Sequence, residues 1–181
     1  RGKLCASLRE ALEKCELHDG MYFGFHHHFR DGDYVINMVM QEVARMGIRD
    51  ITICATSMGA AHDALEPLIK QGVIAGIQSS GVRGKIGEAI SKGKFKKPAI
   101  IRSHGAIEEG DIHLDVAFIG APTADEYGNA RAVGGKSDCG VLSYSMADAK
   151  YADRVVVITD CLVPFPNTPA SISMTDVDYV C

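Results

Sequence analysis

The apolar positions of the chain follow two alternating periods. Short runs of β-branched and aromatic residues alternate with segments in which apolar residues recur every three or four positions, as they do on one face of a helix. The short runs predict strands at 21–26, 50–55, 73–79, 98–102, 114–121 and 154–159. Because strands that alternate with helices form βαβ units, the pattern predicts the α/β class, with a mostly parallel sheet flanked by helices.

The clearest predicted helix follows the first strand. Its apolar residues recur at helical spacing from Val35 to Met46, Asp33 is a candidate N-cap, and Gly47 can end the helix. Further helices are predicted at 66–71, 82–92 and around 142–149. Each predicted helix joins two strands, as a parallel sheet requires.

Length and composition fit this fold class. The 181 residues match one large domain, and 46% hydrophobic with 23% charged residues is typical of a globular protein. No linker-like stretch divides the chain, so we expect a single domain over residues 1–181. Since the chain begins without Met and stops within an apolar stretch at Cys181, we expect it to be a fragment of a longer subunit.

Net charge and cysteine spacing argue against several classes of function. The net charge of −4, with scattered positive residues, argues against nucleic acid as a partner. The basic run from Lys92 to Lys97 is either a solvated loop or a binding site for an anionic carrier or a nucleotide phosphate. The six cysteines contain no Cys-x-x-Cys pair, and no apolar run approaches the roughly 20 residues that span a bilayer. We therefore expect a cytoplasmic protein without a membrane partner.

Candidate chemistry lies where the predicted strands end. In open α/β sheets ligands bind outside the carboxyl ends of the strands, because loop amides and helix N-termini converge there. Small or polar residues occupy these positions, at 26–28, 56–57, 78–81, 102–105, 120–123 and 159–160. Such a set of strand ends suits a ligand that carries carboxylates or phosphates.

Two of these segments leave alternatives open. The stretch 79–85 is either an anion cradle, with backbone N–H groups at its glycines and the planar fork of Arg83, or a glycine-rich turn. His26, His27 and His28 cannot all face one metal if the strand continues, because neighbouring side chains point to opposite faces. We therefore expect no metal site, and the histidines are either anion donors or structural residues.

Four motifs stand in a fixed order along the chain: FHHHFRDGD at 25–33, SGVRG at 80–84, IRSHG at 101–105, and the long stretch 115–129. Together they closely resemble the citrate lyase alpha-subunit family, over essentially the whole chain. The resemblance implies the fold shared by CoA transferases and ribose-5-phosphate isomerases. It also implies a citrate CoA-transferase reaction, in which an acetyl-S-carrier and citrate give a citryl-S-carrier and acetate.

The resemblance implies partners as well. The thiol belongs to a CoA-like prosthetic group, a dephospho-CoA derivative, on a separate acyl carrier (gamma) subunit, and acetyl-CoA can substitute for it. A beta subunit then cleaves the citryl thioester to oxaloacetate. We expect no cofactor bound in this chain itself and a homo-oligomeric assembly. The family subunit has a second domain that supplies the opposite wall of the active site, so the fragment alone is expected to be inactive.

The resemblance and the strand-end positions together nominate site residues. We expect Arg83 and Arg102 to clamp carboxylate or phosphate groups, because guanidinium forks match them. His27 and His28 are the expected catalytic donors. Glu126 is a candidate covalent carrier, although the citrate lyase type passes through a citric–acetic mixed anhydride that needs no nucleophile. The other expected substrate-binding residues are Ser79, Ser80, Gly81, Gly84, Ser103, His104, Asp125 and Asn129.

Other interpretations remain for the whole chain and for one motif. A sugar-phosphate isomerase of this fold would need a carboxylate base over the sugar carbon, and a non-enzymatic effector module would carry a helix-turn-helix upstream. The stretch 1–18 contains only one helix-like segment. The residues at 125–129 form either a plain tight turn or a loop that shapes the substrate crevice. The family pattern also leads us to expect a few more residues, including arginines, between Gly105 and Ala106.

Overall fold

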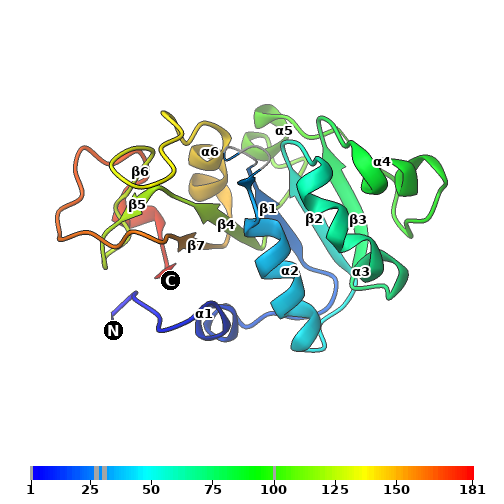
Figure 1. Cartoon of the computed structure of the whole chain (residues 1–181), viewed down its shortest axis with the longest axis horizontal. Coiled ribbons are helices and arrows are strands. Elements are labelled where there is room, and N and C mark those ends of the chain that lie inside the picture. The colour runs from blue at the N-terminus through cyan, green and yellow to red at the C-terminus, as the bar shows by residue number, and fades with distance from the viewer. Residues whose placement is uncertain (1, 27–28, 30–31, 100) are drawn as a thin grey trace.

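A six-stranded parallel sheet forms the centre of the protein. The computed structural model describes residues 2–26, 29, 32–99 and 101–181, with the backbone alone at residue 104. Neighbouring strands follow the order β3-β2-β1-β4-β7-β8 (Figure 1). Their bounds are β1 Tyr22–Phe25, β2 Ile51–Ala55, β3 Ile74–Ser79, β4 Val116–Gly120, β7 Arg154–Ile158 and β8 Tyr179–Val180.

Helices cover both faces of the sheet. One face carries α1 (Leu8–Lys14), α2 (Val35–Arg45), the 3₁₀ helix η2 (Ala60–Leu65), α3 (Glu66–Lys70) and α4 (Gly84–Ser91). The other face carries α5 (His104–Glu108) and α6 (Tyr144–Tyr151). Helix η3 (Met174–Asp176) and a small antiparallel hairpin, β5 (Thr123–Ala124) with β6 (Ala130–Arg131), lie in the connections around β7.

Alternation along β4 separates the two hydrophobic cores. Val116 and Phe118 join the core beneath α1 to α4, whereas Ala117 and Ile119 join the core on the α6 side. This is the expected result of successive strand residues pointing to opposite faces. The Phe118 ring of β4 contacts two rings of β1: it stacks on that of Phe25, with centroids 5.5 Å apart, and meets that of Phe23 edge-on, with centroids 5.1 Å apart.

Helix α2 forms as its sequence pattern predicts, and the other predicted helices are confirmed as α3, α4 and α6. The buried residues of α2 include Ile36, Val39, Met40 and Val43, which recur every three or four positions. The predicted N-cap is one residue off, because Tyr34 holds that position. Asp33 still contributes, since its Oδ1 accepts a hydrogen bond from the Val35 N–H at 3.1 Å.

Five of the six predicted strands are confirmed, and the strand at 98–102 is wrong. Its described residues lie outside any strand, and Ile101 is 79% exposed. Just before the segment, the Lys97 N–H donates to the Ala75 carbonyl of edge strand β3, at 3.1 Å. The apolar run therefore does not extend the sheet, and the chain turns into α5, which the sequence pattern did not reveal.

Two smaller findings complete the fold. The junction of Gly105 and Ala106, where we expected extra residues, lies inside α5, and the Ser103 hydroxyl caps that helix by accepting from the Ala106 N–H at 3.1 Å. Within the described ranges, no helix is long and apolar enough to cross a membrane.

Candidate functional site

The carboxyl ends of the strands form one edge of the sheet, which we call the carboxyl edge. From β1 the chain continues to β2 and then β3, whereas β4 lies on the other side of β1. The connections that leave β1 and β4 therefore diverge, and α/β sheets bind ligands at such a point. Two parts of this edge differ in chemistry: a polar rim above β1, β2 and β3, and a cleft above β4 and β7.

The polar rim consists of His26, Thr56, Ser79 and Ser80. Nδ1 of His26 lies 2.6 Å from Oγ1 of Thr56. The Thr56 carbonyl accepts from the Ser80 N–H at 3.3 Å and from the Ser79 hydroxyl at 3.4 Å. The Ser79 hydroxyl also accepts from the Gly81 N–H at 3.2 Å. Hydrogen bonds thus join the ends of three adjacent strands and bring the predicted residues of the 79–81 segment together.

The predicted anion cradle at the start of α4 already holds a carboxylate of the protein. Oδ1 of Asp63 accepts from the Lys85 N–H at 2.8 Å. Gly84 has a φ of +67°, and a Cβ at this position would lie 2.5 Å from the same Asp63 oxygen. Gly84 is therefore explained by its backbone conformation and by the close approach of Asp63. The neighbouring Arg83 and Lys85 side chains are both exposed, so each offers an accessible positive charge, and Arg83 alone offers a planar guanidinium fork.

Arg102 does not face the open edge. Its side chain is only 1% exposed, and it forms an ion pair with the equally buried Asp148 of α6. Its Nη1 also donates to the Phe25 carbonyl at 2.7 Å, at the end of β1. The Ser80 hydroxyl in turn donates to the Arg102 carbonyl at 2.6 Å. This arrangement is that of an anchor between β1, α6 and the rim, which differs from the substrate clamp that we predicted.

Asp148 itself has an unusual proton affinity. Burial raises its pKa to about 6, and the opposing charge of Arg102 offsets only part of this rise. The desolvation free energy of the carboxylate therefore exceeds its electrostatic attraction to Arg102, as is common for buried ion pairs.

Asp125 and Asn129 belong to a buried hydrogen-bond network in the β5–β6 turn. The Asp125 carboxylate accepts five hydrogen bonds, from the backbone of Tyr127, Gly128, Asn129 and Asn167 and from the Asn129 side chain. Burial would raise the pKa of Asp125, but these bonds outweigh it and the pKa lies below its ordinary value. Asp125 thus stabilises a tight turn, which is one of the two interpretations of residues 125–129 that the sequence left open.

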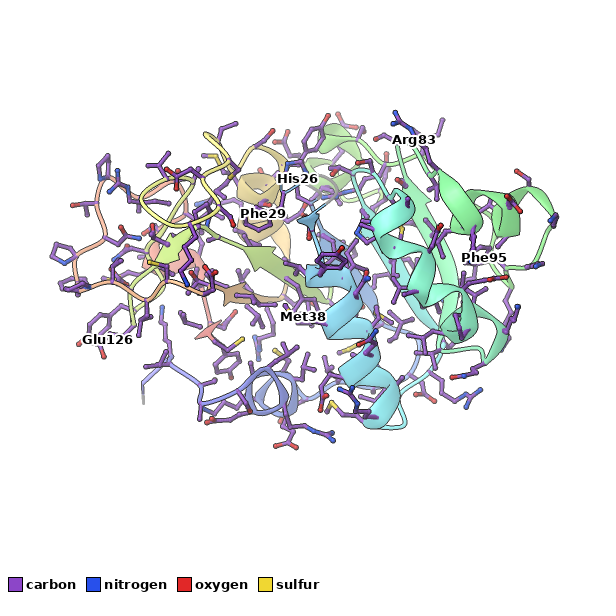
Figure 2. The ribbon with its side chains drawn as sticks, viewed as in Figure 1. His26, Phe29, Met38, Arg83, Phe95 and Glu126 are labelled. Carbon is purple, nitrogen blue, oxygen red and sulfur yellow. The ribbon has the colours of Figure 1, made fainter. Side chains whose placement is uncertain are left out.

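Several predicted residues lie apart from the rim. Glu126 is exposed at the tip of the β5–β6 turn, and Figure 2 shows it at the opposite end of the molecule from Arg83, with His26 between them. His27 and His28 lie outside the described residues, and His104 is placed by its backbone alone at the start of α5. Their predicted roles stay predictions.

The β4–β7 cleft has a volume of about 790 Å³ and was only partly anticipated. Its described lining comes from the segment before α2, from α2 itself, from the ends of β4 and β7, and from the segment 137–139. The apolar lining residues include Phe29, Tyr34, Val35, Met38, Pro122 and Ile158. The sequence pattern identified the strand ends but not Tyr34 or Met38. A signal for such residues exists, because an apolar residue that lies off the buried face of an amphipathic helix is unusual.

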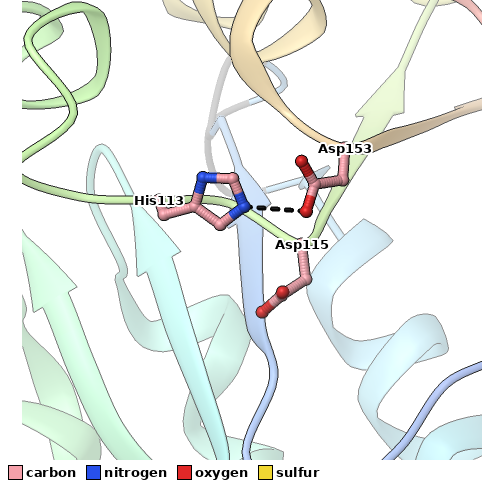
Figure 3. Close-up of side chains that lie close together, drawn as sticks. All are labelled: His113, Asp115 and Asp153. Atoms are coloured by element: carbon pink, nitrogen blue, oxygen red, sulfur yellow. Dashed lines mark hydrogen bonds and ion pairs between the residues drawn. The ribbon is translucent and has the colours of Figure 1, made fainter.

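A further group of titratable side chains lies at the amino ends of the strands (Figure 3). Nε2 of His113 lies 2.7 Å from Oδ2 of Asp153, and Oδ2 of Asp115 accepts from the Tyr22 N–H at 2.6 Å. These contacts connect the starts of β4, β7 and β1. His113 and Asp153 are more than half exposed, at 60% and 58%, so their pair contributes little stability.

The sheet order and its helices define the class of protein. Glutaconate coenzyme A-transferase from Acidaminococcus fermentans superimposes with a TM-score of 0.70, over 98% of this chain and 74% of that chain, at 17% identity. Identity this low shows the fold alone. The protein is therefore an α/β protein with a CoA-transferase-like fold, as the sequence predicted.

The family follows from closer relatives. Residues 1–181 match the family described as Citrate lyase, alpha subunit (CitF). The citrate lyase alpha chain of Klebsiella pneumoniae is 47% identical over 98% of this chain. A Streptococcus mutans structure, described as an alpha subunit of citrate lyase in complex with citrate, is 57% identical with a TM-score of 0.96 over 99% of this chain. The chain belongs to the citrate lyase alpha-subunit family, and it spans 36% of the length of each of these two relatives.

Replacing Arg102 by Met is expected to lower the free energy of unfolding by about 3–5 kcal/mol at neutral pH, because Asp148 stays buried without its partner. Because the pKa of Asp148 is raised, its carboxyl takes up a proton as the pH falls, and a neutral carboxyl is less unfavourable in the core than a charged one. The stability difference between the variant and wild type should therefore shrink as the pH falls. Urea unfolding from about pH 5 to about pH 8 measures both effects. The double variant Arg102→Met/Asp148→Leu should recover most of the loss, and a loss under about 1 kcal/mol at neutral pH would contradict the anchor role.

Asp125→Asn is expected to lower the free energy of unfolding by about 2–3 kcal/mol at neutral pH. The amide NH₂ that replaces one carboxylate oxygen cannot accept the hydrogen bonds of the buried N–H groups around it. The pKa of Asp125 is lowered in the folded state. Its contribution is therefore complete above the unfolded value of about 3.9 and is lost as the pH falls through the lower folded value. Unfolding curves of wild type and variant should converge only below about pH 4. The exposed neighbour provides the control Glu126→Gln, which should match wild type, and a difference that grows on acidification would exclude the network.

Proposed function

We propose that this chain carries the citrate-binding part of a citrate CoA-transferase, the alpha component of citrate lyase. One observation carries the proposal: the polar rim and the exposed Arg83 gather at the carboxyl edge of a chain that belongs to the citrate lyase alpha-subunit family. The Streptococcus mutans relative is a complex with citrate, which supports this assignment. Family membership also favours it over a sugar-phosphate isomerase or an effector-binding module.

The proposed reaction exchanges acetate for citrate on a thioester. A citrate carboxylate attacks the acetyl carbonyl, the carbon–sulfur bond breaks, and a citric–acetic anhydride and a thiolate form. The thiolate then attacks the citryl carbonyl of the anhydride, which releases acetate and leaves the citryl thioester. Negative charge develops on the carbonyl oxygen in each addition, so preorganised N–H and O–H donors lower both barriers.

The polar rim and Arg83 fit the binding of a polycarboxylate. Citrate must exchange its water shell for donors, and the exposed guanidinium of Arg83 can supply them. The hydroxyls of Ser79 and Ser80 donate to the carbonyls of Thr56 and Arg102 and so fix the shape of the rim beside it. His27 and His28 are proposed as further donors from the end of β1. Figure 2 shows Glu126 well apart from His26 of the rim and from Arg83, which favours the anhydride route over a covalent thioester on Glu126.

The thioester is proposed to arrive on a separate protein. A CoA-like prosthetic group on an acyl carrier subunit would be the substrate, with acetyl-CoA as its substitute, and a beta subunit would cleave the citryl thioester. The basic run from Lys92 to Lys97, in which Lys92, Lys94 and Lys96 are exposed, is a candidate contact for an anionic carrier. Opposite charge on the two surfaces would speed their encounter and make its rate depend on salt.

The test of this function uses the full-length protein with acetyl-CoA and citrate. Citryl-CoA and free acetate are expected to appear in equal amounts, as followed by mass spectrometry of the thioester pool. A folded protein that neither binds citrate nor releases acetate in a citrate-dependent way would exclude the proposal.

Arg83→Gln is expected to raise the KM for citrate about tenfold or more, because loss of one charge-assisted hydrogen bond costs about 1.5–3 kcal/mol. Arg83→Lys keeps the charge but not the planar fork, so it should recover only part of the loss. The control is Lys70→Gln, since Lys70 is an exposed cation at the far end of α3. Equal citrate KM values for wild type and Arg83→Gln would remove Arg83 from the site.

A further inference from the structure

The β4–β7 cleft lies beside the polar rim and differs from it in shape. With a volume of about 790 Å³, it is within the range of sites that enclose a small organic ligand. Gly120 shapes its floor at the end of β4. A Cβ on Gly120 would lie 2.6 Å from Cε2 of Phe29 and 2.8 Å from Cγ2 of Val35, so only glycine lets these two side chains pack there.

The wall contributed by α2 is apolar and exposed. Tyr34 is 55% exposed and Met38 is 44% exposed, one helical turn apart. Neither residue belongs to the hydrophobic core, whose α2 members lie on the other side of the helix. Apolar surface of this kind inside a cleft is stabilised when an apolar ligand covers it.

The charges among the described lining residues of the cleft are negative. Its charged lining residues, within the described part of the chain, are Asp138 and Asp160. The N-terminus of α2, which would otherwise attract an anion, is matched by Asp33, whose carboxylate accepts from the Val35 N–H. Burial raises the pKa of the Cys139 thiol, backbone hydrogen bonds offset part of this rise, and the charges of Asp138 and Asp33 add to it.

Charge and shape together select a class of ligand. Citrate carries three carboxylates at neutral pH, so the described charges of this cleft repel it, whereas Arg83 and the hydroxyls lie on the other part of the edge. A neutral chain with methylene and amide groups fits an apolar wall with a few polar contacts. The thioester of the proposed reaction ends in such a chain, the pantetheine-like arm between sulfur and phosphate.

We propose that the β4–β7 cleft binds the neutral pantetheine-like arm of the thioester substrate, while citrate binds over the polar rim. Because β4 is the direct neighbour of β1, an arm lying along the cleft brings its acyl group toward the end of β1, next to the rim. The two substrates then approach from opposite sides of β1. This assignment rests on the proposed function for the identity of the thioester.

The test is made in the full-length protein with the variant Met38→Glu. A charge on the apolar wall should raise the KM for acetyl-CoA and weaken direct binding of S-acetylpantetheine, each about tenfold or more, because a neutral chain cannot compensate a buried carboxylate. The Kd for citrate, measured by calorimetry without thioester, should stay within about twofold. Met38→Leu should behave as wild type, since it keeps the apolar surface.

The matched control is Met146→Glu. Met146 is 45% exposed on helix α6, almost the same fraction as Met38, and does not line the cleft. It should leave both substrates unaffected. Arg83→Gln should give the reciprocal result, with weaker citrate binding and unchanged binding of S-acetylpantetheine.

Two outcomes overturn the inference. If Met38→Glu weakens citrate and spares S-acetylpantetheine, the cleft is part of the citrate site. If it changes neither, the arm binds elsewhere. Failure of the proposed function is distinguishable, because wild type would then form no citryl thioester while S-acetylpantetheine binding and its loss in Met38→Glu would still be measured.

Discussion

The buried ion pair of Arg102 and Asp148 holds the parts of the carboxyl edge in one arrangement. The guanidinium contacts α6 through Asp148 and the end of β1 through the Phe25 carbonyl, and the backbone of Arg102 receives the Ser80 hydroxyl. A buried pair of this kind adds little net stability, because desolvation consumes most of its Coulomb energy. Replacing only one partner nevertheless lowers the stability of the fold, because the other charge stays buried without a counterion. Its effect is therefore geometric: the rim and α6 cannot shift relative to β1 without uncovering a buried charge.

Two chemical environments follow from this arrangement. Above β1 to β3 the rim is polar, and Arg83 adds an accessible positive charge. Above β4 and β7 the cleft is apolar with negative charges at its described margin. A reaction that joins a polyanion to a neutral thioester arm needs both environments side by side. Separate sites also prevent either substrate from occupying the other's place, because charge repels one and the lack of apolar contacts disfavours the other.

The network around Asp125 supports the far wall of the cleft. Asn167 donates to Asp125 and to the Thr123 hydroxyl, and that hydroxyl donates to the Val133 carbonyl at 2.9 Å. Thr123 directly follows Pro122, which lines the cleft. A carboxylate with five donors is costly to displace, so the turn is a rigid support. This explains why an acidic motif beside a strand end can be structural even where the neighbouring surface binds ligand.

The sequence by itself determined the α/β class, five strands, the main helices and the family, since hydrophobic periodicity reports local burial and the motifs are specific in their order. It also indicated the strand ends where polar groups gather. Tertiary structure decided the direction in which each polar side chain points. Arg102 turned inward to Asp148, Asp63 filled the start of α4, and Glu126 was carried to the far end of the molecule. The first two outcomes depend on partners that lie 46 and 22 positions away in the chain, which no local pattern can reveal.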